Sequence, residues 1–305
     1  MQSRNQDNKN IELSIILISF NTAQITANCI ESIYNSKDIK KIALEVIVLD
    51  NASSDHSIQT IKSLQKKYSS LKLIESKENT GFSKGNNLAA KQAKGEYILF
   101  LNSDTLVLEN AVYKLLTFYK TNQQKAQFIG AKLFNKNMTS QPSAGPFYSL
   151  SVVFGALFLK GDYWGLTRSS PDRTTKIDWV SGACIMTKKQ YFDEVGGFDE
   201  GIFMYMEEID LLYRARQKNY NTYFYPDAQF IHLGSASSNG KTFPILQVYN
   251  GFLYFYNKHH KGMALNILKG MLQLKALVSL AIGRITGKEY LIKTYEKAYH
   301  IASMA

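Results

Sequence analysis

The chain has 305 residues, of which 45% are hydrophobic and 20% are charged, and its formal net charge is +11 at pH 7. This size and composition exclude a disordered chain and allow one large α/β domain with an appendage. The positive charge favours anionic partners such as nucleotides, nucleic acid or an acidic membrane surface, although a generally basic solvated surface gives the same count.

The N-terminus and the cysteines exclude further classes. Residues 1–10 form a polar tail without the pattern of a signal peptide. We find no stretch of roughly 18 uncharged apolar residues, the length that spans a bilayer. Cys29 and Cys184 lie far apart without CxxC spacing, which indicates neither a disulfide framework nor a zinc site. We therefore expect a cytoplasmic protein.

The first hundred residues alternate apolar runs with helical patterns. Four near-continuous apolar runs are typical of buried strands: 12–19, 44–49, 71–75 and 97–101. Apolar residues at helical spacing indicate three helices between them: 23–35, 57–68 and 83–93. This alternation predicts βαβ units and a parallel sheet, in which ligands bind beyond the carboxyl ends of the strands. Three polar segments should meet at that edge: 19–22, 50–55 and 102–104.

The second half of the chain is less regular. After a helix at 109–121 and a strand at 128–132, residues 135–176 contain prolines and glycines without clear periodicity. A loop of this length inside a domain is usually functional or mobile. Further elements are expected afterwards: a strand at 179–187, helices at 188–195 and 207–219, and short strands at 222–225 and 229–232.

The last part of the chain, from residue 244, is expected to be helical and is basic. Residues 256–305 hold eight Lys or Arg against two Glu. Asn266, Lys269 and Gln273 form a polar stripe, and the leucines opposite are Leu265, Leu268, Leu272 and Leu277. This amphipathic pattern suits either the interface of a membrane or packing on the preceding domain.

Two strand ends carry side chains that can bind a metal. Asn102 and Asp104 end a strand in LFLNSDTLV, and His232 ends a late strand in FIHLGSAS. A hard cation held by one or two oxygen ligands can neutralise a diphosphate. Asn and Asp also end strands as turn formers, and a lone histidine is more often a core residue than a ligand.

Two loops suit a nucleotide. In DNASSD, Asp50 can accept a hydrogen bond from a base or ribose hydroxyl, whereas Ser53 or Asp55 can cap the next helix. NTGFSKGNN, residues 79–87, opens a helix whose glycines allow close backbone approach and whose N-terminus suits an anion. Neither loop is a GxGxxG or Walker A sequence, which disfavours a dinucleotide-binding dehydrogenase.

An acidic cluster lies in FMYMEEIDLLYRARQ. Acidic residues ordinarily stabilise a helix N-terminus, but Glu207, Glu208 and Asp210 repel one another, which raises at least one pKa and suits a general base. Adjacent helical residues point about 100° apart, so Glu207 and Glu208 are not expected to face the same acceptor hydroxyl. We expect Asp210 to serve the helix start or Arg214.

Together these segments resemble the inverting glycosyltransferases of family 2, specifically their non-processive, rhamnosyltransferase-like members. The matching segments occur in the family's order between about residues 12 and 262: SIILISFNT, VIVLDNASSD, NTGFSKGNN, GEYILFLNSDTLV, WVSGACIMTKKQYFDEVGGFDE, FMYMEEIDLLYRARQ, IHLGSAS and FLYFYNKHHKG. The resemblance implies an α/β, GT-A nucleotide-diphospho-sugar transferase fold, with a mostly parallel central sheet flanked by helices. It implies a catalytic domain at 11–243, divided into a nucleotide-binding half at 11–132 and an acceptor half at 133–243. A helical C-terminal extension follows at 244–305.

The resemblance also implies roles for individual residues. Glu208 would be the catalytic base with Glu207 beside it, and Asp104 and His232 would bind Mn²⁺ or Mg²⁺. Further residues would bind the nucleotide sugar: Ser19, Asp50, Asn79, Asn86, Asn102 and Asp104. The sugar and acceptor pocket would contain Trp179, Ser181 and Gly182. Asn102 replaces the first aspartate of the family's D-x-D motif, and Glu208 stands where many relatives carry aspartate.

The implied reaction transfers one sugar, because the Q-x-x-R-W motif of processive relatives is missing. The donor would be dTDP-rhamnose or otherwise a UDP-sugar, and the acceptor a glycan or a lipid-linked saccharide in polysaccharide or other cell-surface glycan assembly. The enzyme would sit peripherally at the inner face of the cell membrane. No nucleic-acid module is recognisable. Two alternatives stay open: a sugar nucleotidylyltransferase, although SFNTA is not its glycine-rich loop, and a non-enzymatic basic membrane-surface protein.

Overall fold

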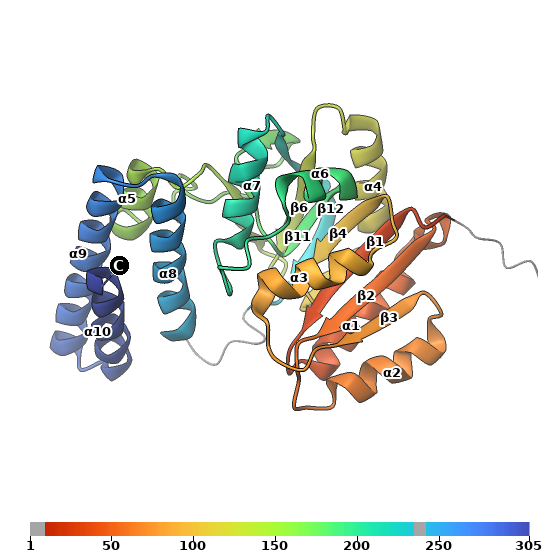
Figure 1. The fold of residues 1–305 in the computed structure, drawn as a ribbon, viewed down its shortest axis with the longest axis horizontal. Coiled ribbons are helices and arrows are strands. Elements are labelled where there is room, and N and C mark those ends of the chain that lie inside the picture. Colours follow the sequence, from red (N-terminus) through yellow and green to blue (C-terminus); the bar gives the residue numbers. More distant parts are fainter. Residues whose placement is uncertain (1–9, 235–241, 305) are drawn as a thin grey trace, which may run out of the picture.

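A computed structural model describes residues 10–234 and 242–304 of the chain. Residues 1–9 of the predicted polar tail and the end of the IHLGSAS segment lie outside the described residues. Figure 1 shows a central sheet with helices on both faces and a group of C-terminal helices at one side. This arrangement confirms the predicted α/β class.

The first half of the chain forms the predicted parallel sheet, in the order β3-β2-β1-β4. Its strands are β1 (Leu13–Ser19), β2 (Leu44–Asp50), β3 (Leu71–Glu75) and β4 (Tyr97–Leu101). The connections contain α1 (Ala23–Asn35), the short 3₁₀ helix η1 (Ile39–Lys41), α2 (Ser57–Lys67) and α3 (Gly81–Gln92). Ser19 pairs with Asp50 in register, so the polar ends of these strands meet at one edge as expected.

The second half adds antiparallel neighbours to the sheet. β11 (Cys184–Lys188) lies antiparallel between β4 and β6 (Phe128–Phe134), and β12 (Thr222–His232) runs parallel to β6. β5 (Thr105–Val107) pairs antiparallel with β12. Two short strands extend the same sheet: β7 (Ser140–Gln141) on β6 and β9 (Thr175–Ile177) on β12.

The second half also departs from three predictions. The strand expected at 179–187 is interrupted at residues 181–183, because β10 (Trp179–Val180) leaves the main sheet and pairs with β8 (Ala144–Gly145). The strands expected at 222–225 and 229–232 are one strand, β12, with an irregularity between Tyr225 and Gln229. The segment 135–176 contains the helix α5 (Leu150–Phe158), whose nearly all-apolar sequence LSVVFGALF hides any helical period.

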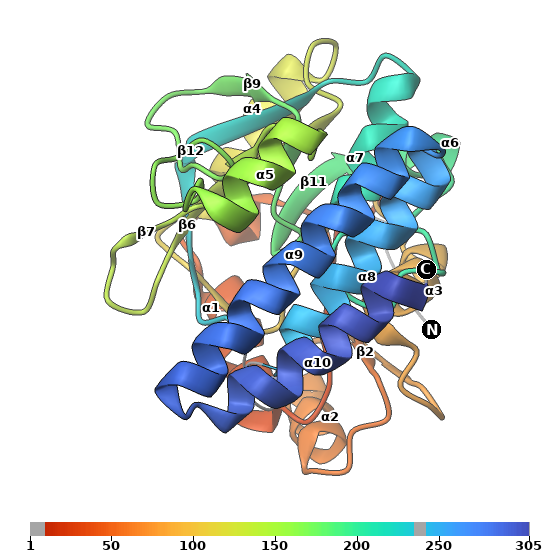
Figure 2. The ribbon, with the colours of Figure 1, turned by 90° about the vertical axis from the view of Figure 1, so that its left-hand side faces the viewer.

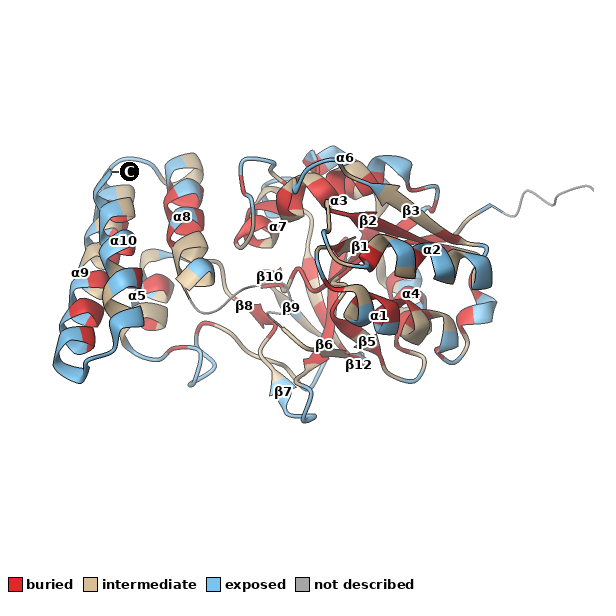
Figure 3. Cartoon of the chain, turned by 90° about the horizontal axis from the view of Figure 1, so that it is seen from below, coloured by how far each residue is buried: buried red, intermediate tan, exposed pale blue. Residues whose placement is uncertain are grey.

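Two hydrophobic layers lie on the two faces of the sheet, because successive strand residues point to opposite sides. Ile15 and Leu17 are buried on the side of α1, α2 and α4 (Ala111–Asn122). Ile16 is buried on the side of α3, α6 (Lys189–Val195) and α7 (Glu207–Gln217). Figure 3 shows the strands buried between helices whose outer surfaces are exposed.

The C-terminal extension is a packed helical group. It contains α8 (Thr242–His259), α9 (Met263–Thr286) and α10 (Glu289–Met304), which pack against one another, while α5 packs against α9 (Figure 2). Leu268 and Leu272 are fully buried, but Leu277, predicted on the same face, is 50% exposed. The packing interpretation is therefore correct for one side of α9 and leaves its other side open. Contrary to our expectation, α9 is long and apolar enough to cross a membrane, by length and composition alone.

Candidate active site

A cavity of about 950 Å³ opens at the edge of the sheet where the polar strand ends meet. It brings together side chains from both halves of the chain. Nine predicted site residues line it: Asn79, Asn102, Asp104, Trp179, Ser181, Gly182, Glu207, Glu208 and His232. The interruption between β10 and β11 places Ser181 and Gly182 in the cavity wall. The break in the predicted strand is therefore part of the candidate site.

Three other predicted site residues do not line this cavity. The Ser19 hydroxyl lies 3.1 Å from that of Thr26, and the Asn86 amide donates to the Phe82 carbonyl at 3.0 Å within α3. Asp50 is fully buried, and one of its oxygens accepts from the Ser53 N–H at 2.9 Å. Its other oxygen has no hydrogen-bond partner among the described residues.

The neighbouring Asn51, which the sequence does not single out, lines the cavity and organises the start of α3. Its amide donates to the Asn79 side chain at 2.9 Å and to the Gly81 carbonyl at 3.1 Å, and its oxygen accepts from the Thr80 N–H at 2.8 Å. Gly81 has φ +76°, and a Cβ there would lie 2.6 Å from the Phe203 carbonyl oxygen. Glycine is therefore required where α3 meets the segment that leads into the acidic cluster.

The predicted metal ligands lie together. Pairing of β5 with β12 sets Thr105 opposite His232, and the Asp104 carboxylate lies 3.3 Å from His232 Nε2. His232 Nδ1 lies 2.7 Å from the Gln141 oxygen, and its Nε2 lies 3.2 Å from the Asn102 amide nitrogen. With Nδ1 donating to Gln141, Nε2 carries its lone pair on the side of Asp104 and Asn102.

These residues fit a divalent ion. Ligands that share an octahedral Mg²⁺ or Mn²⁺ at about 2.1 Å lie about 3 Å apart, close to the separation of Asp104 and His232. No group of three or more His, Cys, Asp or Glu ligands occurs within residues 10–234 and 242–304. An ion here would take its remaining ligands from diphosphate oxygens and water, as Mg²⁺ commonly does.

The acidic cluster begins after a strained turn. Tyr205 and Met206 are consecutive non-glycine residues in the left-handed region, with φ of 66° and 76°. Such conformations cost of order 1 kcal/mol each and concentrate at functional sites. The turn starts α7 at Glu207, and both Glu207 and Glu208 line the cavity beside Gly182, where an added Cβ would lie 3.6 Å from the Glu208 Cβ.

Glu207 is buried and Glu208 is half-buried, and neither carboxylate is fully hydrogen-bonded among the described residues. One carboxylate oxygen of each is buried without a partner among the described residues. Burial and the adjacent Glu208 raise the pKa of Glu207 well above its ordinary value. Burial also raises the pKa of Glu208, but the charge of Arg168 opposes that rise. Because two adjacent carboxylates in one cavity cannot both ionise readily, the positive charge of Arg168 favours ionisation of Glu208 over that of Glu207.

Asp210 is separate from this pair, as predicted, and anchors α7. Its carboxylate bonds Arg214 at 2.7 Å, Lys258 at 2.8 Å and His259 at 2.7 Å. Burial would raise the pKa of Asp210, but the hydrogen bond from His259 and the charges of Arg214 and Lys258 lower it to about 2. Asp210 therefore fixes α7 against α8 and is absent from the cavity wall.

Arg168 is the main cavity residue that sequence reasoning misses. It lies in the irregular segment 135–176, where no spacing distinguishes it from the neighbouring cations Lys160, Arg173 and Lys176. Its guanidinium lies 5.8 Å from the Trp179 ring centroid and donates to the Pro142 carbonyl at 3.4 Å. Its Nε is buried without a partner among the described residues, which leaves a donor for an anionic ligand.

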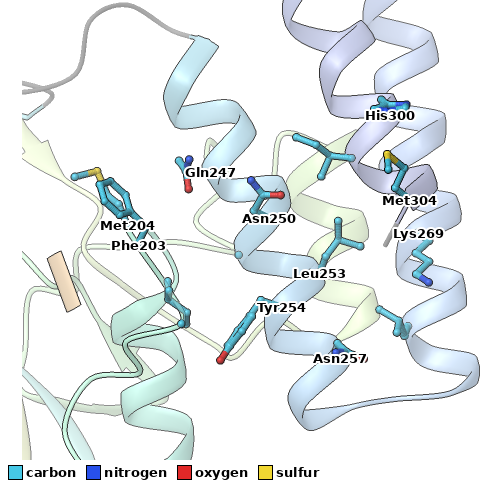
Figure 4. Close-up of a pocket in the computed structure, with 15 residues that line it drawn as sticks. Phe203, Met204, Gln247, Asn250, Leu253, Tyr254, Asn257, Lys269, His300 and Met304 are labelled. Atoms are coloured by element: carbon cyan, nitrogen blue, oxygen red, sulfur yellow. The ribbon is translucent and has the colours of Figure 1, made fainter. Parts of the chain in front are cut away.

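A second cavity, of about 680 Å³, lies between the 201–204 segment and the C-terminal helices (Figure 4). Gln247, Asn250 and Tyr254 of α8 face it, and Lys269 lies on the opposite side. Phe203 also lines the main cavity. Because no Asp or Glu lines this second cavity, it offers no carboxylate base.

Comparison with known proteins was made for the whole chain. The family model described as glycosyl transferase family 2 matches residues 14–196. A low-salt glycan biosynthesis hexosyltransferase, Agl10 of Haloferax volcanii, is 26% identical over 69% of this chain and 63% of its own length. The rhamnosyltransferase WbbL of Escherichia coli is 30% identical over 62% of this chain and 72% of its own length.

Two further comparisons extend this picture. The N-acetylglucosaminyl-diphospho-decaprenol L-rhamnosyltransferase of Mycobacterium tuberculosis is 25% identical over 65% of this chain and 69% of its own length. The crystal structure of GalNAc-T7 with UDP, GalNAc and Mn²⁺ aligns with a TM-score of 0.59 at 13% identity. That alignment covers 82% of this chain and 48% of the other, and it supports the fold alone. The chain spans less than two thirds of the length of the Haloferax relative.

Proposed function

The chain belongs to glycosyl transferase family 2 and has the predicted GT-A fold, and we propose that it transfers one sugar from a nucleotide-diphosphate sugar to an acceptor hydroxyl with inversion. One observation carries this proposal: a single cavity holds a carboxylate pair, Glu207 and Glu208, and two adjacent side chains that could share a metal ion, Asp104 and His232. The two known rhamnosyltransferases among the relatives support dTDP-rhamnose as the first donor to test, before UDP-sugars.

The proposed mechanism is a single displacement. The Glu208 carboxylate removes the proton of the acceptor hydroxyl as that oxygen attacks the anomeric carbon from the face opposite the leaving group. The bond from the anomeric carbon to the diphosphate oxygen breaks, and the nucleoside diphosphate leaves with the electron pair. A divalent ion held by Asp104 and His232 would neutralise negative charge on the diphosphate. Glu207, whose pKa is raised by burial and by the adjacent Glu208, can donate a hydrogen bond within the cavity in its protonated form.

We propose a glycan or lipid-linked saccharide as the acceptor, in the assembly of a polysaccharide or other cell-surface glycan at the inner face of the cell membrane. The relatives named for glycan biosynthesis and for a diphospho-decaprenol acceptor support this class. The family match does not favour a nucleotidylyltransferase or a non-enzymatic role.

Product analysis tests the proposed activity. The full chain would be incubated with nucleotide sugars, Mn²⁺ or Mg²⁺ and a saccharide acceptor panel, and the released nucleotide would be identified by chromatography. We expect a nucleoside diphosphate and an acceptor extended by one sugar of inverted anomeric configuration. Release of a sugar 1-phosphate would instead indicate nucleotidylyl transfer, and a retained configuration would exclude the single displacement.

Arg168 should set the pH dependence of this reaction. Its charge opposes the rise in the pKa of Glu208, so Arg168→Gln raises that pKa further. Since the base must be ionised, the acidic limb of the kcat/KM profile should move to higher pH, and Arg168→Lys should partly restore it. Arg173→Gln is the matched control, because Arg173 is exposed on the same segment and does not line the cavity. An unchanged limb in Arg168→Gln would contradict the assignment of Glu208 as the titrating base.

A further inference from the structure

The outward side of α9 is an uninterrupted apolar stripe. Its members are 44–85% exposed and fall on one side of the helix at about 100° per residue: Met263, Ile267, Leu274, Leu277, Val278, Ile282 and Ile285. The opposite side, with Leu268, Leu272 and Ala276, is fully buried. Side chains at this spacing share one face of a helix. The helix therefore has two apolar faces, and only one of them is used in the fold.

A second group of exposed apolar side chains lies beside α9. It belongs to α5 and the segment that follows it: Phe154, Leu159, Tyr163, Trp164 and Leu166. α5 packs against α9, and the Lys275 amine donates to the Leu157 carbonyl at 2.8 Å, which joins the end of α5 to the middle of α9. Figure 2 shows α5 and α9 side by side on the same side of the molecule. We call the two groups together the apolar face.

We propose that the apolar face docks on the surface of an anionic lipid bilayer. Scattered exposed apolar residues need no explanation, but a contiguous patch of this extent marks an interaction site. Lys275 and Arg284 flank this stripe on α9, and α9 contains no acidic residue, so the charge beside the stripe complements anionic headgroups. Tyr163 and Trp164, 78% and 68% exposed, are the residue types that favour the headgroup region.

The charge pattern also decides against a second copy of this chain as the occupant. Two copies joined through the outward face of α9 would bring Lys275 and Arg284 of each helix together, and α9 carries no acidic residue to compensate them. The same cations are attracted by an anionic membrane. An anionic bilayer would therefore both cover the apolar stripe and attract the cations of α9, whereas self-association would only cover the stripe.

The helix lies in the plane of the membrane in this arrangement and does not cross it. One side of α9 is already buried against α8 and α10. Lys275, near its centre, would be placed in the hydrocarbon by a spanning orientation, at a cost of several kcal/mol. An in-plane helix instead inserts only its outward side chains and leaves the amines near the headgroups.

Docking brings the cavity mouth to the membrane, an inference that rests on the proposed glycosyl transfer. Asp162 and Arg168 line the main cavity, and the exposed Tyr163, Trp164 and Leu166 lie between them in the chain. The segment that contacts the bilayer is therefore also part of the cavity wall. A saccharide held on a membrane lipid could reach Glu208 while its lipid stays in the bilayer.

The two tryptophans of the chain make the proposal directly measurable. Trp164 is exposed, whereas Trp179 is 2% exposed and serves as an internal reference. The full chain would be mixed with vesicles of phosphatidylcholine containing phosphatidylglycerol, and with vesicles of phosphatidylcholine alone. We expect tryptophan emission to shift to shorter wavelength with the anionic vesicles, and the shift to be absent in Trp164→Phe although that variant still sediments with them.

The triple variant Leu274→Gln, Val278→Gln, Ile282→Gln removes apolar area without changing charge. It should lower vesicle binding by about tenfold or more, because membrane binding scales with buried apolar area. Met138→Gln is the matched control, since Met138 is equally exposed on the distant β6–β7 turn. Equal retention of the triple variant and wild type, or no emission shift, would overturn the proposal. A wild-type dimer that the triple variant converts to monomers, without vesicle binding, would assign the face to self-association. Nucleoside diphosphate binding by the triple variant would also be measured by thermal shift. This measurement distinguishes failure of the docking proposal from failure of the catalytic proposal.

Discussion

Glu208→Gln is expected to lower kcat by roughly two to four orders of magnitude, the usual scale for a lost general base. The amide has nearly the same shape but cannot accept the acceptor's proton, so the affinity for the nucleoside diphosphate should stay close to that of the wild type. Single-turnover kinetics with a saturating donor measures the chemical step, and isothermal titration with the nucleoside diphosphate measures binding.

Glu207→Gln is the matched control for that variant. Glu207 lies one residue away, lines the same cavity and is equally short of hydrogen-bond partners. Burial and the adjacent Glu208 raise its pKa well above the ordinary value, which favours the protonated form that an amide donor can replace. Its substitution should change the acceptor KM more than kcat. A dead Glu207→Gln beside a normal Glu208→Gln would move the base one residue back, and two active variants would exclude this helix from the chemistry.

The pH profile adds an independent check on the pair. Burial raises the pKa of Glu208, and activity requires its ionised form. The rate should therefore fall as pH decreases through the raised pKa, at a higher pH than an exposed glutamate would give. Glu208→Gln should lose this acidic limb together with most of its rate. In Arg168→Gln the acidic limb of the pH profile should persist but lie at higher pH.

The parallel half of the sheet could be predicted because its strands are buried on both faces and have short helical connections. The edge where Ser19 pairs with Asp50 follows from that topology alone. The spacing of residues in the sequence does not reveal which of two adjacent residues faces the cavity. Asn51 lines the cavity, where Asp50 was expected. Local pattern failed in 135–176, where α5 is almost wholly apolar and Arg168 has no periodic context.

Long-range pairing is the other limit of sequence reasoning. Asp104 and His232 are far apart in the chain, and only the antiparallel pairing of β5 with β12 makes them neighbours. The family resemblance supplied this contact, because no local periodicity encodes it. Similarly, the amphipathic pattern of α9 was visible, but which leucines pack inward depends on α8 and α10. Leu277 was therefore placed on one apolar stripe with Leu268 and Leu272, although those two are buried and Leu277 is exposed.

Removal of divalent metal should abolish transfer. Asp104 and His232 supply only two protein ligands, so an ion there depends on the donor's diphosphate and water for the rest of its coordination. We expect excess chelator to reduce turnover to background and Mn²⁺ or Mg²⁺ to restore it. The same metals should increase the thermal shift produced by a nucleoside diphosphate, a measurement that does not depend on turnover.

The loss of metal binding and of transfer should be larger for a residue that contacts the ion than for one that orients a ligand. Asp104→Ala removes a ligand and should abolish both the metal-dependent thermal shift and transfer. Gln141→Leu removes the partner that orients His232 through Nδ1 and should weaken metal affinity by about 10- to 100-fold while excess metal rescues turnover. Gln190→Leu is the control, because Gln190 pairs with Glu194 on exposed α6 away from the cavity.

Full activity in excess chelator would remove the metal from the mechanism. Charge on the leaving diphosphate would then have to be stabilised by protein donors such as Arg168, the one arginine among the described residues that line the cavity.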